Sequence, residues 1–268
     1  MTPHMKRWLT GVIAVPILFG IIAFGGEILF SILIVLASLM GMQEYNRMSF
    51  QQGFTLEKTE TLIIALFILL SAFSGNLRLL LTGLTFSVMV VLMLNLLRAR
   101  RTGIDIAPAG RVVLGILYIP LLMAHFILIR QTPSGVLWVF FILVLAFSGD
   151  IAAFYVGRKF GKRKLLAEVS PGKTVEGTLG LIAGSIAGCL LFRFFFFPAV
   201  PVVHVVLLGL VGSIAGQLGD LCESALKRGA GVKDSGMLLP GHGGILDRLD
   251  CLMFIVPLVY HYQGYVLS

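Results

Sequence analysis

The sequence contains few charged residues. They make up 13% of its 268 residues, whereas a soluble domain carries about 25%. Hydrophobic residues account for 57%, and the mean hydropathy is +0.97. This composition excludes an ordinary soluble domain and predicts an all-α, polytopic integral membrane protein.

Cysteine and acidic residues are also scarce. Cys189, Cys222 and Cys251 show neither metal-ligand spacing nor a disulfide framework, so we interpret them as packing residues. The 13 acidic residues are outnumbered by 21 Lys and Arg, which gives a net charge of +8. Loops on one side of a membrane protein carry such an excess, so we favour this interpretation over nucleic-acid binding. We find no internal repeat and no low-complexity segment.

Long apolar runs, by contrast, are frequent. A membrane-spanning helix needs about 20 mostly apolar residues, and the sequence predicts about nine such spans. They cover roughly 8–25, 28–42, 59–74, 79–97, 112–129, 136–156, 178–197, 202–221 and 249–266, and the last could begin near Ile245. The first run lacks a convincing cleavage site, so we expect it to be retained as a span.

Loop charge gives an independent test of the nine spans. With the N-terminus and every second loop placed on one side, that side holds 18 of the 21 Lys and Arg residues. Basic residues favour the cytoplasm, which predicts an N-terminus inside, a C-terminus outside and a location in the inner (plasma) membrane. We divide the chain into an N-terminal transmembrane region, 1–105, with about four spans, and a second transmembrane region, 106–268, with about five. The second region has cytoplasmic loops at 157–177 and 222–248, and the motifs described below lie in it and make it the expected catalytic region.

Glycines recur every four residues in two predicted spans. Gly180, Gly184 and Gly188 lie in one, and Gly212 and Gly216 in the next. Small residues at this spacing allow helix backbones to approach closely. We favour packing within the chain, and a homodimer seam is the alternative.

Acidic residues gather where the last two predicted spans meet the segment between them. Asp220 and Glu223 share one helix face if the eighth span continues through them, as Asp247 and Asp250 do if the ninth helix starts there. Two carboxylate pairs at helix ends could hold a hard cation such as Mg²⁺ together with substrate phosphates. The alternative is that these acids form salt bridges with Lys227, Arg228 and Arg248.

The segment between these acids is rich in glycine and basic residues. Glycines let backbone N–H groups approach phosphate oxygens, and Lys227, Arg228 and Lys233 can neutralise phosphate charge. His242 could serve as a proton donor, a phosphate ligand or a turn residue. The isolated glycines could also serve a turn, but their combination with acids and bases indicates phosphate chemistry.

A second polar segment, SPGKTVEG at 170–177, follows a basic loop and, further upstream, Asp150. It shares a Gly-Lys-Thr triplet with the phosphate-binding P-loop, but Ala167 replaces the upstream glycine and no clear strand precedes it, so a P-loop fold is rejected. A helix starting near Thr174 could still direct free N–H groups at a phosphate, with Lys173 as a point charge.

Together these residues resemble the phosphatidate cytidylyltransferase (CDP-diacylglycerol synthase) family. That family's signature is similar to S-x-ϕ-K-R-x4-K-D-x-G-x2-ϕ-P-x-H-G-G-ϕ-x-D-R-ϕ-D, and every fixed position is met between Ser224 and Asp250. The upstream pattern D-x-x-A-Y-x-x-G…S-P-x-K-T-x-E-G is met apart from Phe154, where tyrosine is expected. The motifs cover about 110–268, and the first 100 residues match in hydropathy alone.

The resemblance implies the reaction of CTP with phosphatidate to give CDP-diacylglycerol and pyrophosphate, with Mg²⁺ or another divalent cation and possibly a second one. It implies metal ligands among Asp150, Asp220, Glu223, Asp247 and Asp250. It implies catalytic roles for Asp220, Lys227, His242, Asp247 and Asp250. It implies substrate binding by Lys173, Thr174, Ser224, Arg228, Lys233, Gly243, Gly244 and Arg248.

Two other functions are open to such a chain. A CTP-dependent polyprenol or lipid kinase would transfer the γ-phosphate to a lipid alcohol and would need a base. A transporter would place its charges near the bilayer midplane between repeats, whereas here they gather at span ends. A CDP-alcohol phosphotransferase is disfavoured because D-G-x-x-A-R…G-x3-D-x3-D is not found.

Overall fold

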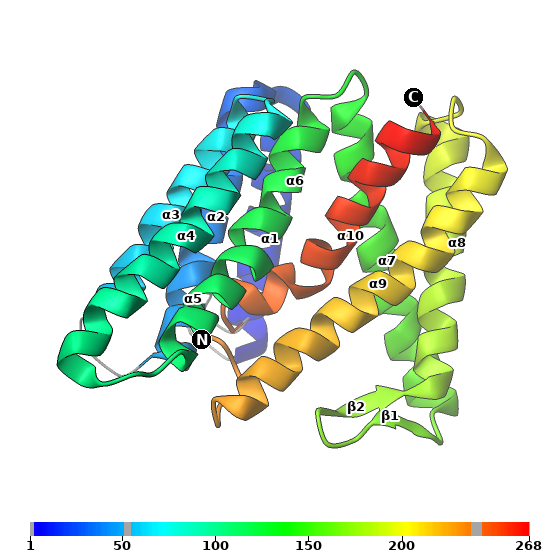
Figure 1. Ribbon diagram of the computed structural model, residues 1–268. Helices are drawn as coiled ribbons and strands as arrows, with labels where there is room; N and C mark the ends of the chain where they lie inside the picture. Colours follow the sequence, from blue (N-terminus) through cyan, green and yellow to red (C-terminus); the bar gives the residue numbers. More distant parts are fainter. Residues whose placement is uncertain (1–2, 51–54, 237–242, 268) are drawn as a thin grey trace. The chain divides into compact units, whose positions relative to one another are not determined.

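The computed structural model describes residues 3–50, 55–236 and 243–267, which form two compact units (Figure 1). The first unit comprises Met1–Gln131 and Asp234–Leu246, and the second Thr132–Lys233 and Asp247–Ser268. The units therefore separate after Gln131, whereas the division made from sequence falls at residue 105. The signature segment, Ser224–Asp250, is divided between the two units, because its residues Asp234–Leu246 fold with the first unit and the others belong to the second.

The first unit is helical. Its helices are α1 (Pro3–Phe24), α2 (Gly26–Ser49), α3 (Leu56–Phe73), α4 (Leu77–Thr102), α5 (Ala107–Tyr118) and α6 (Pro120–Arg130). Helices α2, α3, α5 and α6 pack on one another around buried side chains such as Met42, Tyr45 and Ile68. Helices α5 and α6 adjoin at Pro120, where proline lacks the N–H that would continue a helix.

The second unit combines four long helices with a hairpin. Its elements are α7 (Gly135–Phe160), β1 (Lys164–Leu166), β2 (Ser170–Thr174), α8 (Val175–Phe196), α9 (Val202–Gly229) and α10 (Leu246–Val266). Helices α7 and α8 make the most extensive pairing, and α9 packs on both. The first residue of α10, Leu246, is counted with the first unit.

The predicted glycine stripe lies in the α7–α8 contact. A Cβ added at Gly180 would lie 2.7 Å from Val156 Cβ, and one at Gly184 would lie 2.8 Å from the carbonyl oxygen of Ser148. A Cβ at Gly188 would collide with the Ser148 side chain. Packing within the chain, the favoured interpretation of this stripe, is confirmed for these three glycines.

The hairpin departs from the all-α prediction. Strands β1 and β2 are antiparallel and pair Lys164 with Thr174 and Leu166 with Ser170. The expectation that no strand precedes Gly172-Lys173-Thr174 is wrong, because β1 precedes it and the triplet itself ends β2. The strands have three and five residues, too few to give a clear period-two pattern in the sequence.

Each predicted span coincides with a helix, or with the α5–α6 pair. Within the described residues, six segments are long and apolar enough to cross a membrane. They are Gly26–Ser49, Leu77–Arg100, Ala107–Arg130, Gly135–Phe160, Val175–Phe196 and Val202–Gly229. Helices α3 and α10 carry charged residues in their first turns, such as Glu57 and Asp247, and lie outside this group. Helix α1 is also outside it and contributes a shorter apolar helix, Val15–Phe24. The chain is thus an α-helical, multi-pass membrane protein.

Candidate active site

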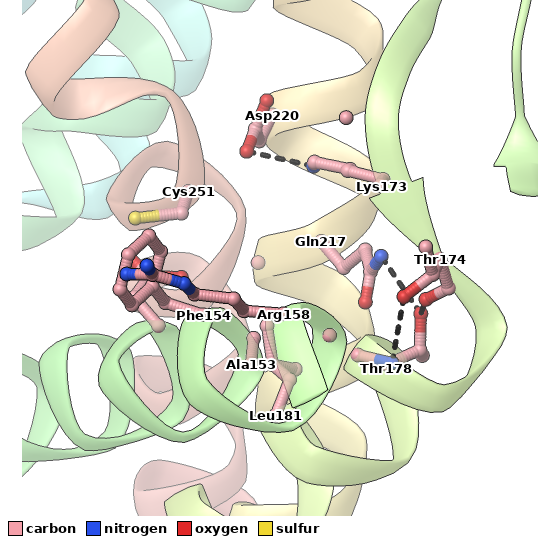
Figure 2. Close-up of a pocket in the computed structure, with 15 residues that line it drawn as sticks. Ala153, Phe154, Arg158, Lys173, Thr174, Thr178, Leu181, Gln217, Asp220 and Cys251 are labelled. Atoms are coloured by element: carbon pink, nitrogen blue, oxygen red, sulfur yellow. Dashed lines mark hydrogen bonds and ion pairs between the residues drawn. The ribbon is translucent and has the colours of Figure 1, made fainter. Parts of the chain in front are cut away.

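The second unit contains a cavity of about 340 Å³ lined by residues from five of its elements (Figure 2). Helix α7 contributes Asp150, β2 contributes Lys173, α9 contributes Gln217 and Asp220, and α10 contributes Cys251. Strand β2 and the start of α8 thus bring the SPGKTVEG segment beside α7 and α9. The structure therefore joins the upstream motif to the acidic end of α9.

An ion pair lies at this cavity. Lys173 Nζ lies 2.7 Å from Asp220 Oδ2, and Figure 2 shows the two side chains pointing toward one another. The Lys173 side chain is 21% exposed and that of Asp220 36%, so solvent and ligands can reach both. Ser224 Oγ, one helical turn on, donates a 3.4 Å hydrogen bond to Asp220 Oδ1. Lys173 is thus paired with a carboxylate, and the oxygen of a bound phosphate could replace that carboxylate as its partner.

The start of α8 is fixed by side-chain hydrogen bonds. Thr174 Oγ1 accepts a 3.0 Å bond from the Gly177 N–H and so caps the helix. Thr178 Oγ1 donates to the Thr174 carbonyl oxygen at 3.2 Å and accepts from Gln217 Nε2 at 3.0 Å. Glu176, in the first turn, instead accepts from the backbone N–H groups of Lys162 and Arg163. The predicted helix start near Thr174 is confirmed.

Gln217 was not among the predicted site residues. Its Oε1 atom is buried, lines the cavity region and lacks a hydrogen-bond partner within the described structure. A buried, unpaired acceptor is costly unless a ligand or water satisfies it. Its position one turn before Asp220, on the same face of α9, was the available sequence signal.

A second cluster surrounds Lys227. Its Nζ lies 2.6 Å from Asp247 Oδ1 and also forms an ion pair with Glu223. Glu223 is fully buried, and the Asp247 side chain is 8% exposed. This arrangement realises, for Glu223 and Asp247, the salt-bridge alternative raised from the sequence.

Asp220 interacts electrostatically with aspartates on two other helices. Asp150 on α7 and Asp250 on α10 both lie within electrostatic range of Asp220 on α9. The backbone of Gly219 packs against the carbonyl of Asp250, because a Cβ added at Gly219 would collide with that oxygen. Asp250 Oδ1 accepts a 2.8 Å bond from the Cys251 N–H. The predicted sharing of faces by Asp220 with Glu223 and by Asp247 with Asp250 follows from α9 running to Gly229 and α10 starting at Leu246.

These carboxylates have the donor chemistry that Mg²⁺ takes in proteins. As they stand, no group of three or more His, Cys, Asp or Glu residues in the described parts of the chain has the arrangement of a metal site. Asp220 faces Lys173, and Asp247 and Glu223 face Lys227. The residues fit a cation by charge and ligand type. In this structure, however, Lys173 and Lys227 form ion pairs with three of these carboxylates.

The remaining predicted residues are distributed over both units. Arg228 Nη1 donates a 3.3 Å bond to the Val232 carbonyl, and Lys233 and Arg248 are exposed in the second unit. Gly243, with a φ of 79°, and buried Gly244 belong to the first unit. His242 lies outside the described residues.

A buried acid that the sequence analysis did not select is Glu44 on α2. It is fully buried and accepts hydrogen bonds from Ser235 and from the N–H groups of Ile245 and Leu246. No local pattern could have indicated it, since its partners lie 191 to 202 residues further along the chain.

Comparison with known proteins defines the class of this fold and site. The model of the cytidylyltransferase family matches residues 5–266, and the chain belongs to that family. It is 36% identical to the phosphatidate cytidylyltransferase of Bacillus subtilis (strain 168), over 97% of both chains. It is 31% identical to the protein of that name from Synechocystis, over 96% of this chain and 95% of the other. It is 35% identical to the one from Staphylococcus epidermidis, over 94% and 96%. These matches extend well beyond the motif-bearing half.

Proposed function

We propose that this membrane enzyme transfers a cytidylyl group from CTP to phosphatidate, giving CDP-diacylglycerol and pyrophosphate for phospholipid biosynthesis. Near full-length similarity to three phosphatidate cytidylyltransferases carries the proposal. The cavity supports it, because Lys173 can bind phosphate there and the lining acids Asp150 and Asp220 could hold a cation that offsets the repulsion of two polyanions.

The reaction needs no strong general base. A phosphate monoester has a second pKa of about 6, so the phosphatidate phosphate is mostly a dianion at neutral pH. One of its oxygens forms a bond to the α-phosphorus of CTP, and the bond from that phosphorus to the α–β bridging oxygen breaks. Pyrophosphate leaves with the electron pair. The protein's task is to align the two anions and offset their repulsion.

Fixed cations perform the second part of this task. We assign Lys173, Lys227, Arg228, Lys233 and Arg248 to the phosphates, with Thr174, Ser224, Gly243 and Gly244 as further binding groups, and we assign His242 a catalytic role. Lys173 supports the assignment best, because it lines the cavity and is partly exposed. As a phosphate approaches, the lysine can exchange a carboxylate partner for a phosphate oxygen without losing compensation of its charge.

We propose that Asp220, Asp247 and Asp250, together with Glu223 and Asp150, hold one or two divalent cations such as Mg²⁺. A bound cation would supply charge neutralisation at the transferring phosphate. We expect EDTA to abolish turnover and added Mg²⁺ to restore it. Full activity in EDTA-treated protein would contradict the proposal.

We further propose nine membrane spans, an N-terminus in the cytoplasm, a C-terminus outside and a site that faces the cytoplasm of the plasma membrane. The bias of 18 of 21 basic residues toward one side supports this orientation. Nucleotides are present on that side. A homodimer is an additional proposal that the contact of the α8 glycines with α7 does not itself require.

Labelled CTP tests the reaction directly. Purified protein is incubated with phosphatidate and CTP carrying label in the α-phosphate or, separately, in the γ-phosphate. We expect α-label to enter the lipid and γ-label to leave as pyrophosphate. Transfer of γ-label to a lipid would instead identify a CTP-dependent lipid kinase.

A further inference from the structure

Glu44 is a carboxylate buried within the first unit. Its side chain is fully inaccessible, and burying a charge is costly unless hydrogen bonds compensate it. Oε2 accepts from Ser235 Oγ at 2.8 Å and from the Leu246 N–H at 2.9 Å, and Oε1 accepts from the Ile245 N–H at 3.0 Å. One side chain of α2 thus binds two separate parts of the signature segment, at Ser235 and at Ile245–Leu246.

The glycines of that segment make room for this carboxylate. A Cβ added at Gly236 would lie 2.8 Å from Glu44 Cδ, and one added at Gly244 would lie 2.7 Å from the same atom. Both distances are too short for a real Cβ. The backbone at these two glycines therefore packs directly on the Glu44 carboxyl group, which gives two signature glycines a role besides contact with phosphate.

Glu44 also caps a helix that is remote in sequence. Leu246 is the first residue of α10, and the first N–H groups of a helix have no partner within it. Glu44 satisfies the N–H groups of Ile245 and Leu246 and places negative charge at the positive end of the helix dipole. Asp247 follows in the first turn of α10 and Asp250 lies one turn further on, so the point at which the helix starts decides where they lie.

We propose that Glu44 is a positioning residue for the cytidylyl transfer: it binds Ser235 and the start of α10 and so sets the placement of Asp247 and Asp250. This inference rests on the proposed function for its catalytic consequence. The hydrogen bonds that carry it do not depend on that function.

The test compares Glu44→Gln and Glu44→Ala with Asn46→Ala. Gln keeps the volume of the side chain but turns an amide NH₂ toward a donor, and Ala removes every acceptor. Asn46 lies on the same helix, is 2% exposed and bonds to Thr61 rather than to the signature segment. Asn46→Ala therefore reports on general loosening of the first unit.

Two readouts are needed. Hydrogen–deuterium exchange of a peptide covering 243–250 should become faster in both Glu44 variants and stay at the parental rate in Asn46→Ala. The kcat, measured at saturating CTP and phosphatidate and well below each variant's melting temperature, should fall about 10- to 100-fold in the Glu44 variants alone, as when residues that orient ligands are lost.

The outcomes separate the two proposals. An active parental protein whose Glu44 variants keep the parental kcat, or an unchanged exchange rate at 243–250, overturns the positioning role. An equal kcat loss in Asn46→Ala also overturns it, because the effect would then come from general destabilisation. A parental protein that transfers no cytidylyl group overturns the proposed function, and the exchange experiment still decides whether Glu44 fixes the start of α10.

Discussion

At the scale of single residues, two lysines stand among carboxylates in the second unit. Lys173 faces Asp220, and Lys227 lies between Glu223 and Asp247. An ammonium group is a compact charge with three donors on a flexible stem, so it can turn from a carboxylate to a phosphate. The two lysines differ in access, because the side chain of Lys173 is 21% exposed and that of Lys227 12%. We therefore assign the first contact with substrate to Lys173.

Replacing Lys173 tests that assignment. We expect Lys173→Ala to lower kcat/KM for CTP about 10- to 100-fold, because hydrogen bonds to charged groups contribute roughly 1.5–3 kcal/mol. Lys164→Ala is the matched control on the same hairpin, since Lys164 is exposed and its Nζ donates a hydrogen bond to the Pro171 carbonyl. Steady-state kinetics with varied CTP measure both. Equal effects of the two substitutions would remove Lys173 from the site.

Asp247 gives a second residue-scale prediction. We expect Asp247→Ala to reduce turnover about 100-fold or more while the protein stays folded, because Lys227 keeps Glu223 as its partner and no buried charge is left unpaired. Cytidylyl transfer and a thermal melt in detergent are the measurements. Glu168→Ala, in the exposed turn of the hairpin, is the control. Near-parental turnover in Asp247→Ala would exclude the residue from the reaction.

The sequence indicated these acids and lysines but not their pairing. Spacing along one helix shows that Asp220 and Glu223 share a face, and the structure agrees. Spacing cannot show that Lys173, which lies 47 positions before Asp220, would contact it. That contact depends on where the hairpin places β2, which carries Lys173. Glu44 was missed for the same reason: its role comes from partners that are distant in the chain.

At the scale of elements, the α7–α8 pair holds the site together. Three glycines of α8 bring its backbone against α7, which carries Asp150, and Thr174 starts α8 next to Lys173. Close approach of two backbones at small residues is a common means of packing membrane helices. The three glycines let α8 approach α7 closely because they have no side chain. This close approach in turn sets the distance between Asp150 and Lys173.

A side chain at Gly184 should separate these helices. Its Cβ would lie 2.8 Å from the Ser148 carbonyl oxygen and collide with Ala152 Cβ. We expect Gly184→Ala to destabilise the protein by about 1–3 kcal/mol, as overpacking does. Gly110→Ala in α5 is the control, since no other atom of the described residues lies within 4 Å of its added Cβ. Thermal melting of both variants in detergent is the measurement, and equal melting temperatures would contradict a tight α7–α8 contact.

Helices were predictable here and the hairpin was not. Apolar runs of about 20 residues report directly on membrane helices, and each of them is helical in the structure. The hairpin is polar and short, so its strands depend on pairing with each other rather than on a hydrophobic face. The functional motif SPGKT consequently appeared to be a loop leading into a helix.

At the scale of the whole molecule, the two units share the signature segment. The first unit contains Ser235, Gly243 and Gly244, while the second contains Lys227, Asp247 and Asp250. The signature therefore leaves the second unit after Lys233 and returns to it at Asp247. Similarity to the relatives also extends over 94% or more of the chain, beyond the motifs themselves.

The orientation of the chain is the last prediction. Helix α8 has 22 residues and is about 33 Å long at 1.5 Å per residue, enough to cross the hydrocarbon core. Exposed Glu168 precedes it and exposed Ala199 follows it. In a background where Cys189, Cys222 and Cys251 are replaced by serine or alanine, we expect a membrane-impermeant maleimide to label Ala199→Cys in intact cells. Glu168→Cys should react only after the membrane is opened, because the basic loop around it favours the cytoplasm. Labelling of both positions in intact cells would show that α8 does not span, and the reverse pattern would place the site outside.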